Sequence, residues 1–271
     1  MRFALCNELC QGWDFRDVCA LAAAAGYEGI EIAPFTLSDS VEDLGPSDRA
    51  RLRETARLHG LDVVGLHWLL VKPPGLYINH PDSAVRERTT AYLRAEIDFC
   101  ADLGGRVVVV GSPQQRNVLA SETYQATWDR TAVVFRTLAP QAAARGVCLC
   151  IEPLARAETN FLNTVAEARR LVEAVNHPAV QLLLDVKAMS DESEPIPEII
   201  RKSVRYLRHF HANDADRQGP GFGNTDFRPI AQALRAIGYQ GFVSVEVFDF
   251  SAGPERIARE SIRCLREAFS E

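Results

Sequence analysis

Four polar residues end apolar runs in the second half of the chain. Glu152 closes CLCIEP, Asp185 closes LLLD, His211 lies in HFHAND and Glu246 lies in VSVEVF. Three carboxylates that converge with an imidazole in apolar surroundings would repel one another unless a cation held them. Three oxygen donors and one nitrogen favour Mn²⁺ or Mg²⁺, with Co²⁺ or Zn²⁺ as further options. The alternative is that each acid separately pairs with an arginine or caps a helix.

These residues need a scaffold that brings the ends of successive strands together. Apolar runs of strand length alternate with longer segments of helical periodicity, several of which end in glycine. This alternation implies parallel strands with right-handed crossovers. The predicted strands cover residues 3–7, 29–33, 62–68, 106–111, 147–152, 180–185, 207–211 and 242–247.

Eight such units in 271 residues predict an α/β fold that is a single (β/α)8 TIM barrel. A doubly wound open sheet usually has fewer strands, and no glycine-rich phosphate motif follows the first strand. No linker and no shift in composition divides the chain, so we expect one domain over residues 1–271. In a barrel the C-terminal strand ends form the mouth, where the four polar residues would meet.

Composition limits the partners and the compartment. The chain is 47% hydrophobic and 24% charged, with a net charge of -6, which is typical of a soluble globular protein. This acidity argues against nucleic acid as a partner, because a phosphate backbone calls for a basic surface. No signal peptide and no membrane-spanning run is present, so we expect no membrane partner and a cytoplasmic location. The seven cysteines lie mostly in predicted strands and helices, which indicates buried, reduced thiols.

Four longer stretches carry a family resemblance: IEPLARAETNFLNT, LLLDVKAM, FHANDADRQGPGFGNTDF and YQGFVSVEVF. They make the chain similar to the xylose isomerase-like TIM-barrel superfamily of sugar (phosphate) isomerases and epimerases. This superfamily includes the ketose 3-epimerases and, more distantly, endonuclease IV. The resemblance implies that Glu152, Asp185, His211 and Glu246 bind one divalent metal ion, often Mn²⁺. It further implies that Glu152 and Glu246 form the acid/base pair and that the chain forms a homo-oligomer.

The chemistry of such a site is consistent with this division of roles. A metal that chelates a substrate carbonyl and its neighbouring hydroxyl acidifies the intervening C–H and stabilises the enediolate. One carboxylate can remove the proton and the other can return one, to the opposite face in an epimerase or to the adjacent carbon in an isomerase. The sequence therefore predicts a metal-dependent isomerase or epimerase acting on a small sugar or sugar phosphate. Two alternatives stay open, a metal-dependent dehydratase of the inosose or dehydroshikimate type and a non-catalytic sugar binder.

Further residues are candidates for contact with the substrate. By the resemblance, Arg217 matches a substrate-contacting arginine and Glu158 a loop glutamate that helps bind substrate. The alternatives are a surface arginine and a helix cap. Position alone suggests the others, which could bind a phosphate, hydrogen-bond the substrate or face the apolar side of a sugar. These are Arg116, His67, Trp13 and Trp68; the alternatives are local hydrogen bonding for His67 and core packing for the two tryptophans.

Ala188 is a departure from the relatives. Endonuclease IV relatives have a histidine three residues after the strand-six acid, where it helps hold extra zinc ions. The ketose 3-epimerases have a substrate-touching histidine there. Ala188 offers neither a ligand nor a donor, so a nuclease is disfavoured and the familiar ketohexose specificity is not assumed. Lys187 is predicted to continue the strand and to point away from Ala188, so we expect no compensation from it.

Overall fold

A closed parallel barrel of eight strands forms the centre of the molecule, in the order β1 to β8, with β8 paired to β1. The structure is a computed structural model that describes residues 1–270; residue 271, the last residue of the predicted domain, lies outside the described residues. The predicted TIM barrel is confirmed. The strands are β1 Arg2–Cys6, β2 Gly29–Ile32, β3 Asp62–Leu66, β4 Val107–Val110, β5 Cys148–Ile151, β6 Val180–Asp185, β7 Leu207–Ala212 and β8 Phe242–Val245.

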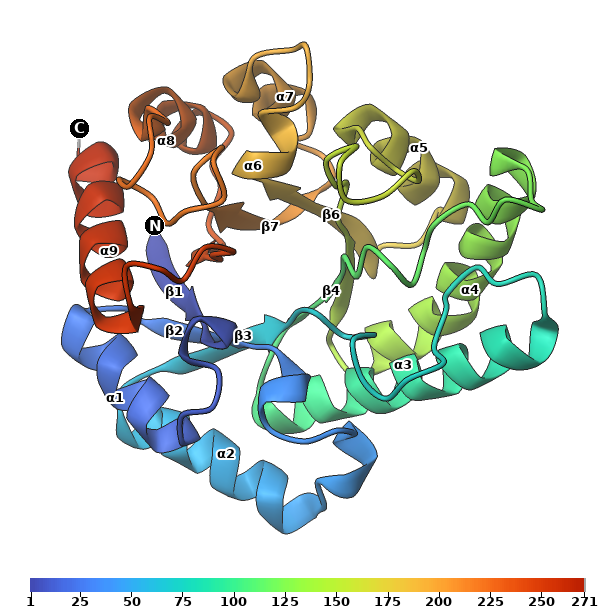
Figure 1. Ribbon diagram of the computed structural model, residues 1–271, viewed down its shortest axis with the longest axis horizontal. Coiled ribbons are helices and arrows are strands. Elements are labelled where there is room, and N and C mark those ends of the chain that lie inside the picture. Colours follow the sequence, from blue (N-terminus) through green and yellow to red (C-terminus); the bar gives the residue numbers. More distant parts are fainter. Residues whose placement is uncertain (271) are drawn as a thin grey trace.

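Helices form an outer ring around the strands (Figure 1). Short 3₁₀ turns supplement them at Asn7–Cys10, Pro34–Thr36 and Val41–Asp43. Among residues 1–270, no helix is both long and apolar enough to cross a membrane. The α-helices are α1 Phe15–Ala25, α2 Pro46–Leu58, α3 Ser83–Leu103, α4 Tyr124–Ala144, α5 Val165–Val175, α6 Val186–Met189, α7 Ile196–Lys202, α8 Phe227–Ala236 and α9 Pro254–Ser270.

Local sequence signals set where these helices begin and end. Asp14 caps α1 by accepting a hydrogen bond from the backbone N–H of Arg16, and α1 ends at Gly26, whose φ of 99° suits glycine. Helix α5 begins with a capping box in which Thr164 and Glu167 bond each other's backbone N–H groups. These signals set the helix lengths, so that each helix ends where the chain re-enters the barrel.

The core has two layers. Between the barrel and the helices lies a large apolar cluster, whereas a smaller one fills the barrel itself. All seven cysteines are free and six of them are buried, five within these two clusters. The smaller cluster consists of Ala4, Val64, Val107, Val109, Cys148, Cys150, Leu183 and Phe242.

The strand boundaries decide where the candidate residues lie. Strands β3, β5 and β8 end one residue before His67, Glu152 and Glu246, respectively. Asp185 is the last residue of β6, and His211 lies within β7 directly opposite it in the register. The candidates therefore lie at the mouth of the barrel, on backbone that the strand ladder holds in place.

Candidate active site

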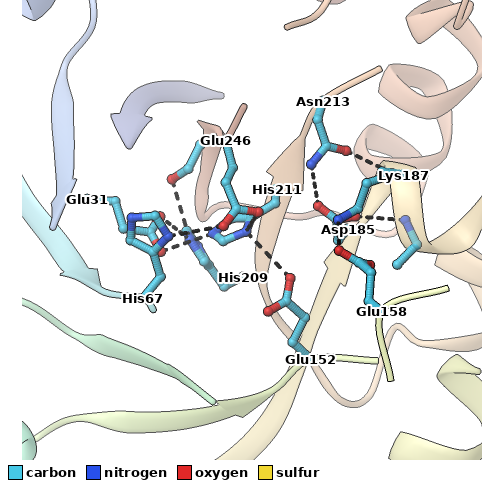
Figure 2. Close-up of polar contacts among 12 residues, drawn as sticks. Glu31, His67, Glu152, Glu158, Asp185, Lys187, His209, His211, Asn213 and Glu246 are labelled. Atoms are coloured by element: carbon cyan, nitrogen blue, oxygen red, sulfur yellow. Dashed lines mark hydrogen bonds and ion pairs between the residues drawn. The ribbon is translucent and has the colours of Figure 1, made fainter. Parts of the chain in front are cut away.

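The four residues that end β5 to β8 converge at the mouth of the barrel (Figure 2). One ligand atom from each of Glu152, Asp185, His211 and Glu246 lies within 4.8 Å of the others. His211 Nδ1 is 3.1 Å from Glu246 Oε2 and 3.9 Å from Glu152 Oε1. All four residues are buried, and none is more than 5% exposed. The sequence reasoning thus identified residues that the fold brings together.

Glu152 is the acid whose charge is least compensated. Burial, together with the negative charge of Glu246, raises the pKa of Glu152 to about 8. Its carboxylate occupies space left by Gly111 at the end of β4, since a Cβ at position 111 would overlap Glu152 Oε2. The guanidinium of Arg116 donates to the backbone carbonyl of Glu152 at 2.6 Å. The loop after β4 therefore holds the backbone of Glu152, and Gly111 leaves room for its side chain.

Asp185 combines two roles that the sequence reasoning treated as alternatives. Its Oδ1 accepts a hydrogen bond from the backbone N–H of Ala188 at 2.8 Å and so caps the short helix α6. Its Oδ2 accepts from the Asn213 side chain, whose Oδ1 in turn accepts from the backbone N–H of Lys187. Burial raises the pKa of Asp185. The same carboxylate thus caps a helix and joins the cluster at the mouth.

The prediction for Lys187 was wrong. Because Asp185 ends β6 and begins α6, Lys187 lies in a helical turn and not on a strand. Its Nζ is 2.7 Å from Glu158 Oε1 and 3.6 Å from the centre of the Phe248 ring. Burial alone would lower the pKa of Lys187, but the carboxylates of Asp185 and Glu158 raise it above its ordinary value. Lys187 is therefore a charged residue at the mouth.

On the other side of the mouth, acids and imidazoles alternate in a buried network. His67 Nδ1 is 3.1 Å from Glu246 Oε1, and His67 Nε2 is 3.0 Å from Glu8 Oε2. On the far side of Glu246, His211 uses Nδ1 for Glu246 and Nε2 for Glu31 Oε1, at 3.0 Å. Glu31 Oε2 is 2.7 Å from His209 Nε2. We call these six residues the imidazole network: Glu8, Glu31, His67, His209, His211 and Glu246.

The imidazole network sets the charge of its members. Burial alone would raise the pKa of Glu246, but His211 and His67 hold it well below its ordinary value. Burial likewise acts against the charged form of His67, yet Glu8 and Glu246 raise its pKa to about 10. The pKa of His211 is also raised, because Glu31 and Glu246 outweigh the effect of burial. Each charge in this half of the site is met by an opposite one.

The candidate substrate residues are placed unequally. Trp68 and Glu158 line a small pocket together with Glu152 and Glu246, while His67 lies beneath it in the imidazole network. Trp68 has an uncommon φ of 56°, and its ring centre lies 6.2 Å from that of Phe248. The pocket is lined by Trp68, Gly111, Pro113, Glu152, Leu154, Glu158, Glu246 and Phe248.

Three other substrate candidates lie outside this lining. Arg116 is buried and points inward, where its guanidinium donates to the backbone carbonyls of Glu152 and Leu162. It therefore holds loops together and does not face the mouth as a phosphate ligand would. Trp13 is 39% exposed, beyond the first 3₁₀ turn. Arg217 is exposed, with its guanidinium carbon 5.7 Å from the centre of the Phe248 ring. Of the three, Arg217 is the one within reach of the pocket wall.

Several residues of the site were missed from the sequence. Glu31, an acid inside the buried strand GIEI, carried a signal that could have been read, because an isolated charge in an apolar strand needs a partner. His209 lies two residues before His211 on the same face of β7. Glu8 lies in a 3₁₀ turn after β1, where the sequence pattern predicted no role.

The residues present fit a divalent metal ion. Carboxylates from β5, β6 and β8 converge with Nδ1 of His211, and two of these carboxylates have raised pKa values that a cation would reverse. The second nitrogen of His211 faces Glu31, an arrangement that orients metal-binding histidines in many proteins. Glu152, Asp185, His211 and Glu246 would hold the ion, with three oxygens and one nitrogen.

Comparison with known families assigns the chain. The family model described as "Xylose isomerase-like TIM barrel" matches residues 19–268. The chain belongs to this family. A probable ketose 3-epimerase of Synechocystis sp. is 26% identical over 90% of this chain and 87% of its own. The 3-dehydro-D-guloside 4-epimerase of Escherichia coli is 28% identical, over 89% of this chain and 90% of its own.

Solved structures agree with this assignment. The D-psicose 3-epimerase of Clostridium cellulolyticum H10, crystallised with D-tagatose, superposes with a TM-score of 0.87 at 24% identity and covers 99% of both chains. At this identity the likeness concerns the fold. The relatives in sequence are sugar epimerases, and epimerases are isomerases, so the prediction of an isomerase is confirmed.

Proposed function

We propose that the chain is a divalent-metal-dependent sugar epimerase or isomerase in which Glu152 and Glu246 transfer the proton. The observation that carries this proposal is the convergence of both carboxylates with Asp185 and His211 at one buried site. A divalent ion bound there would supply the positive charge that stabilises a substrate carbonyl oxygen as the neighbouring C–H loses its proton.

Glu246 is held for proton transfer from one side of the mouth. His67 and His211 each contact one of its oxygens at 3.1 Å, so its orientation is fixed and its ionised form is favoured. An ionised, oriented carboxylate is suited to accept a proton from carbon.

Glu152 faces the same pocket from a different strand. It follows β5, whereas Glu246 follows β8, so two strands separate them around the barrel. With one carboxylate on each side of a bound substrate, one can remove a proton and the other can return one. Return to the opposite face of the same carbon inverts that carbon, and this is the epimerase outcome.

Mn²⁺ is the proposed ion and a small sugar the proposed substrate, with a cytoplasmic location and a homo-oligomeric state. The three oxygen donors support the choice of ion. Free, buried thiols are what a reducing compartment allows. The relatives support the substrate class, since their names refer to ketoses or to a keto sugar derivative.

The test is deuterium uptake from D₂O. The protein is incubated with Mn²⁺ or Mg²⁺ and with D-fructose, D-psicose, D-tagatose, L-ribulose or their phosphate esters, and NMR spectra are recorded after the metal is removed. We expect metal-dependent deuterium at the carbon next to the carbonyl and formation of the epimer. Loss of water instead would identify a dehydratase, and binding without exchange would identify a sugar binder.

Glu246→Gln keeps the shape of the side chain and removes the base. Exchange should fall by at least about 1,000-fold. The matched control, Glu255→Gln, changes an exposed acid at the start of α9 and should leave the rate unchanged. Wild-type exchange in Glu246→Gln would contradict the assigned role.

A further inference from the structure

Lys187 lies beside the pocket although no role was expected for it. It is 6% exposed, and its Nζ contacts Glu158 Oε1 at 2.7 Å (Figure 2). The ammonium also lies 3.6 Å from the centre of the Phe248 ring. Glu158 and Phe248 both line the pocket that Glu152 and Glu246 share. The short helix α6, which directly follows β6, thus places a cation at the wall of the site.

This cation lies on the same short helix as Ala188, which carries no polar group. Helix α6 is fixed at its second and third residues, because Asn213 accepts from the backbone N–H of Lys187 and Asp185 from that of Ala188. The backbone that carries Lys187 is therefore held by two side chains of the site. An ammonium on a fixed turn can supply the hydrogen-bond donor that a methyl group cannot.

Glu158 offers the matching acceptor. Its Oε1 is used by Lys187, whereas its Oε2 is buried and has no hydrogen-bond partner among the described residues. A buried carboxylate oxygen without a donor is unfavourable, so a group that donates a hydrogen bond should be bound there. The Lys187 ammonium has three N–H groups and one of them goes to Glu158. A donor and an acceptor thus lie side by side.

This pairing discriminates between kinds of ligand. A hydroxyl group both donates and accepts, so it can satisfy Glu158 Oε2 and Lys187 Nζ together. A phosphate dianion or a carboxylate only accepts, and it would meet the negative charges of Glu152, Glu158 and Glu246 on the pocket wall. The positive charge of Lys187 is already neutralised by Glu158. The wall therefore suits an uncharged, hydroxylated group.

We propose that Lys187 and Glu158 together form a hydroxyl-binding subsite. In this subsite Lys187 selects a substrate that is uncharged where it contacts these two side chains. The proposal rests on the proposed function, since the subsite adjoins the carboxylates assigned to proton transfer. It concerns binding, however, and it can be tested without turnover.

The first test compares ligands on the wild-type protein. Titration calorimetry of the Mn²⁺-loaded protein measures Kd for D-fructose, D-fructose 1-phosphate and D-fructose 6-phosphate. We expect the ester that places its phosphate at the subsite to bind at least tenfold more weakly than D-fructose. The proposal is overturned if both esters bind as tightly as D-fructose or more tightly.

The second test removes the cation. Lys187→Met should raise Kd and KM for D-fructose at least tenfold, change kcat less than threefold and leave the affinity for Mn²⁺ within twofold. Lys202→Met is the matched control, because Lys202 is exposed at the C-terminal end of α7 and forms an ion pair with Glu194. The Kd of this variant for D-fructose should equal that of wild type. A Kd for Lys187→Met within twofold of wild type, with only a lower Tm, would assign Lys187 a structural role and overturn the proposal.

A double variant covers loss of folding. Lys187→Met with Glu158→Gln leaves no unpaired charge, and it should fold and still show the weakened binding of D-fructose. Binding in wild type without deuterium exchange would contradict the proposed function alone, since the effect of Lys187→Met on Kd would still be measurable. A double variant that binds D-fructose as wild type does would overturn the subsite.

Discussion

The two halves of the barrel mouth handle buried charge in different ways. Towards β1, β2, β3, β7 and β8, the imidazole network places a histidine between successive carboxylates. Glu31 and Glu246 keep pKa values below their ordinary range, whereas burial raises the pKa of Glu8 at the edge of the network. Towards β5 and β6, Glu152 and Asp185 have no imidazole of their own, and burial raises the pKa of both. Figure 2 shows the two groups on either side of His211.

This difference indicates where a cation belongs. Imidazoles balance the charges of Glu31 and Glu246, whereas Glu152 and Asp185 lack such a partner, so a bound cation would stabilise their ionised forms. Glu246 and His211 stand at the boundary and serve both halves. In the proposed metal site, the imidazole network would hold two of the ligands, Glu246 and His211, in place, and Glu152 and Asp185 would supply the other two.

The largest expected effect comes from removing the uncompensated acid. Glu152→Gln should reduce deuterium exchange by at least about 1,000-fold, because one of the two proton-transfer groups is lost. In the metal-free protein it should raise the free energy of unfolding at pH 7 by about 1–3 kcal/mol, measured by urea denaturation. The pKa of Glu152 rises from 4.5 to about 8 on folding, so its ionisation opposes folding increasingly over that pH range.

Glu87→Gln, at an exposed position on α3, is the control for this experiment and should change neither quantity. Unchanged or lower stability of metal-free Glu152→Gln would mean that the charge of Glu152 is compensated. The contrast between the two halves of the mouth would then fail.

On the other side, Glu31→Gln should weaken the imidazole network. The variant removes the carboxylate that orients His211 through Nε2, and losses of such partners lower metal affinity by about 10–100-fold. We expect this loss in a Mn²⁺ titration, together with a lower Tm in the metal-free protein. Glu31→Gln should thus destabilise the metal-free protein, whereas Glu152→Gln should stabilise it. These opposite signs test most directly the contrast between the two halves of the mouth.

An increase in Tm for Glu31→Gln would contradict the contrast between the two halves of the mouth. Glu42→Gln is the matched control, since Glu42 is an exposed acid in the 3₁₀ turn Val41–Asp43, eleven residues after Glu31. Its metal affinity should equal that of wild type.

The affinity for Mn²⁺ should also depend on pH. Glu152 must lose its proton to bind a metal ion, and its pKa in the metal-free protein is about 8. Below pH 8 the apparent affinity should fall by at least about tenfold per pH unit, because each ion displaces the proton of Glu152 and also that of His211, whose pKa is raised. Titrations at pH 6, 7 and 8 would measure this slope, and a constant affinity would show that Glu152 is ionised throughout.

A third buried acid provides a smaller test of the same physics. Glu96 on α3 is fully buried, and burial raises its pKa well above 4.5 against a smaller opposing effect of Tyr92. Stability from a raised pKa is present at low pH and is lost as pH rises through the folded pKa. Glu96→Gln should therefore raise Tm by about 2–6 °C at pH 8 and change it less at pH 5. An equal change at both pH values would show that Glu96 does not titrate.

The fold and the convergence of the four strand-end residues could be predicted because they depend on local patterns. Apolar runs that end in Glu152, Asp185 or Glu246 mark strand ends whatever the rest of the chain does. The order of the strands then follows from the rules for parallel connections, so the acids had to meet.

The residues that were missed depend on side-chain partners or on the exact end of a strand. Glu8 and Glu31 each lie far in sequence from the histidine that they contact, His67 and His211 respectively. Their roles depend on those contacts, which only the folded barrel creates. Lys187 was misplaced because period-two alternation was continued past Asp185, whose own side chain starts a helical turn. Arg116 was expected to help bind a phosphate from the turn after β4, whereas its guanidinium donates to the backbone carbonyls of Glu152 and Leu162.

Gly111 has a consequence for how this chain can vary. A methyl group at this position would occupy the place of the Glu152 carboxylate, so the choice of residue at the end of β4 is tied to the choice at the end of β5. The two positions should change together or not at all as sequences diverge. Relatives that carry a larger residue at the position of Gly111 would have their acid at the end of β5 in another rotamer, or would have lost it.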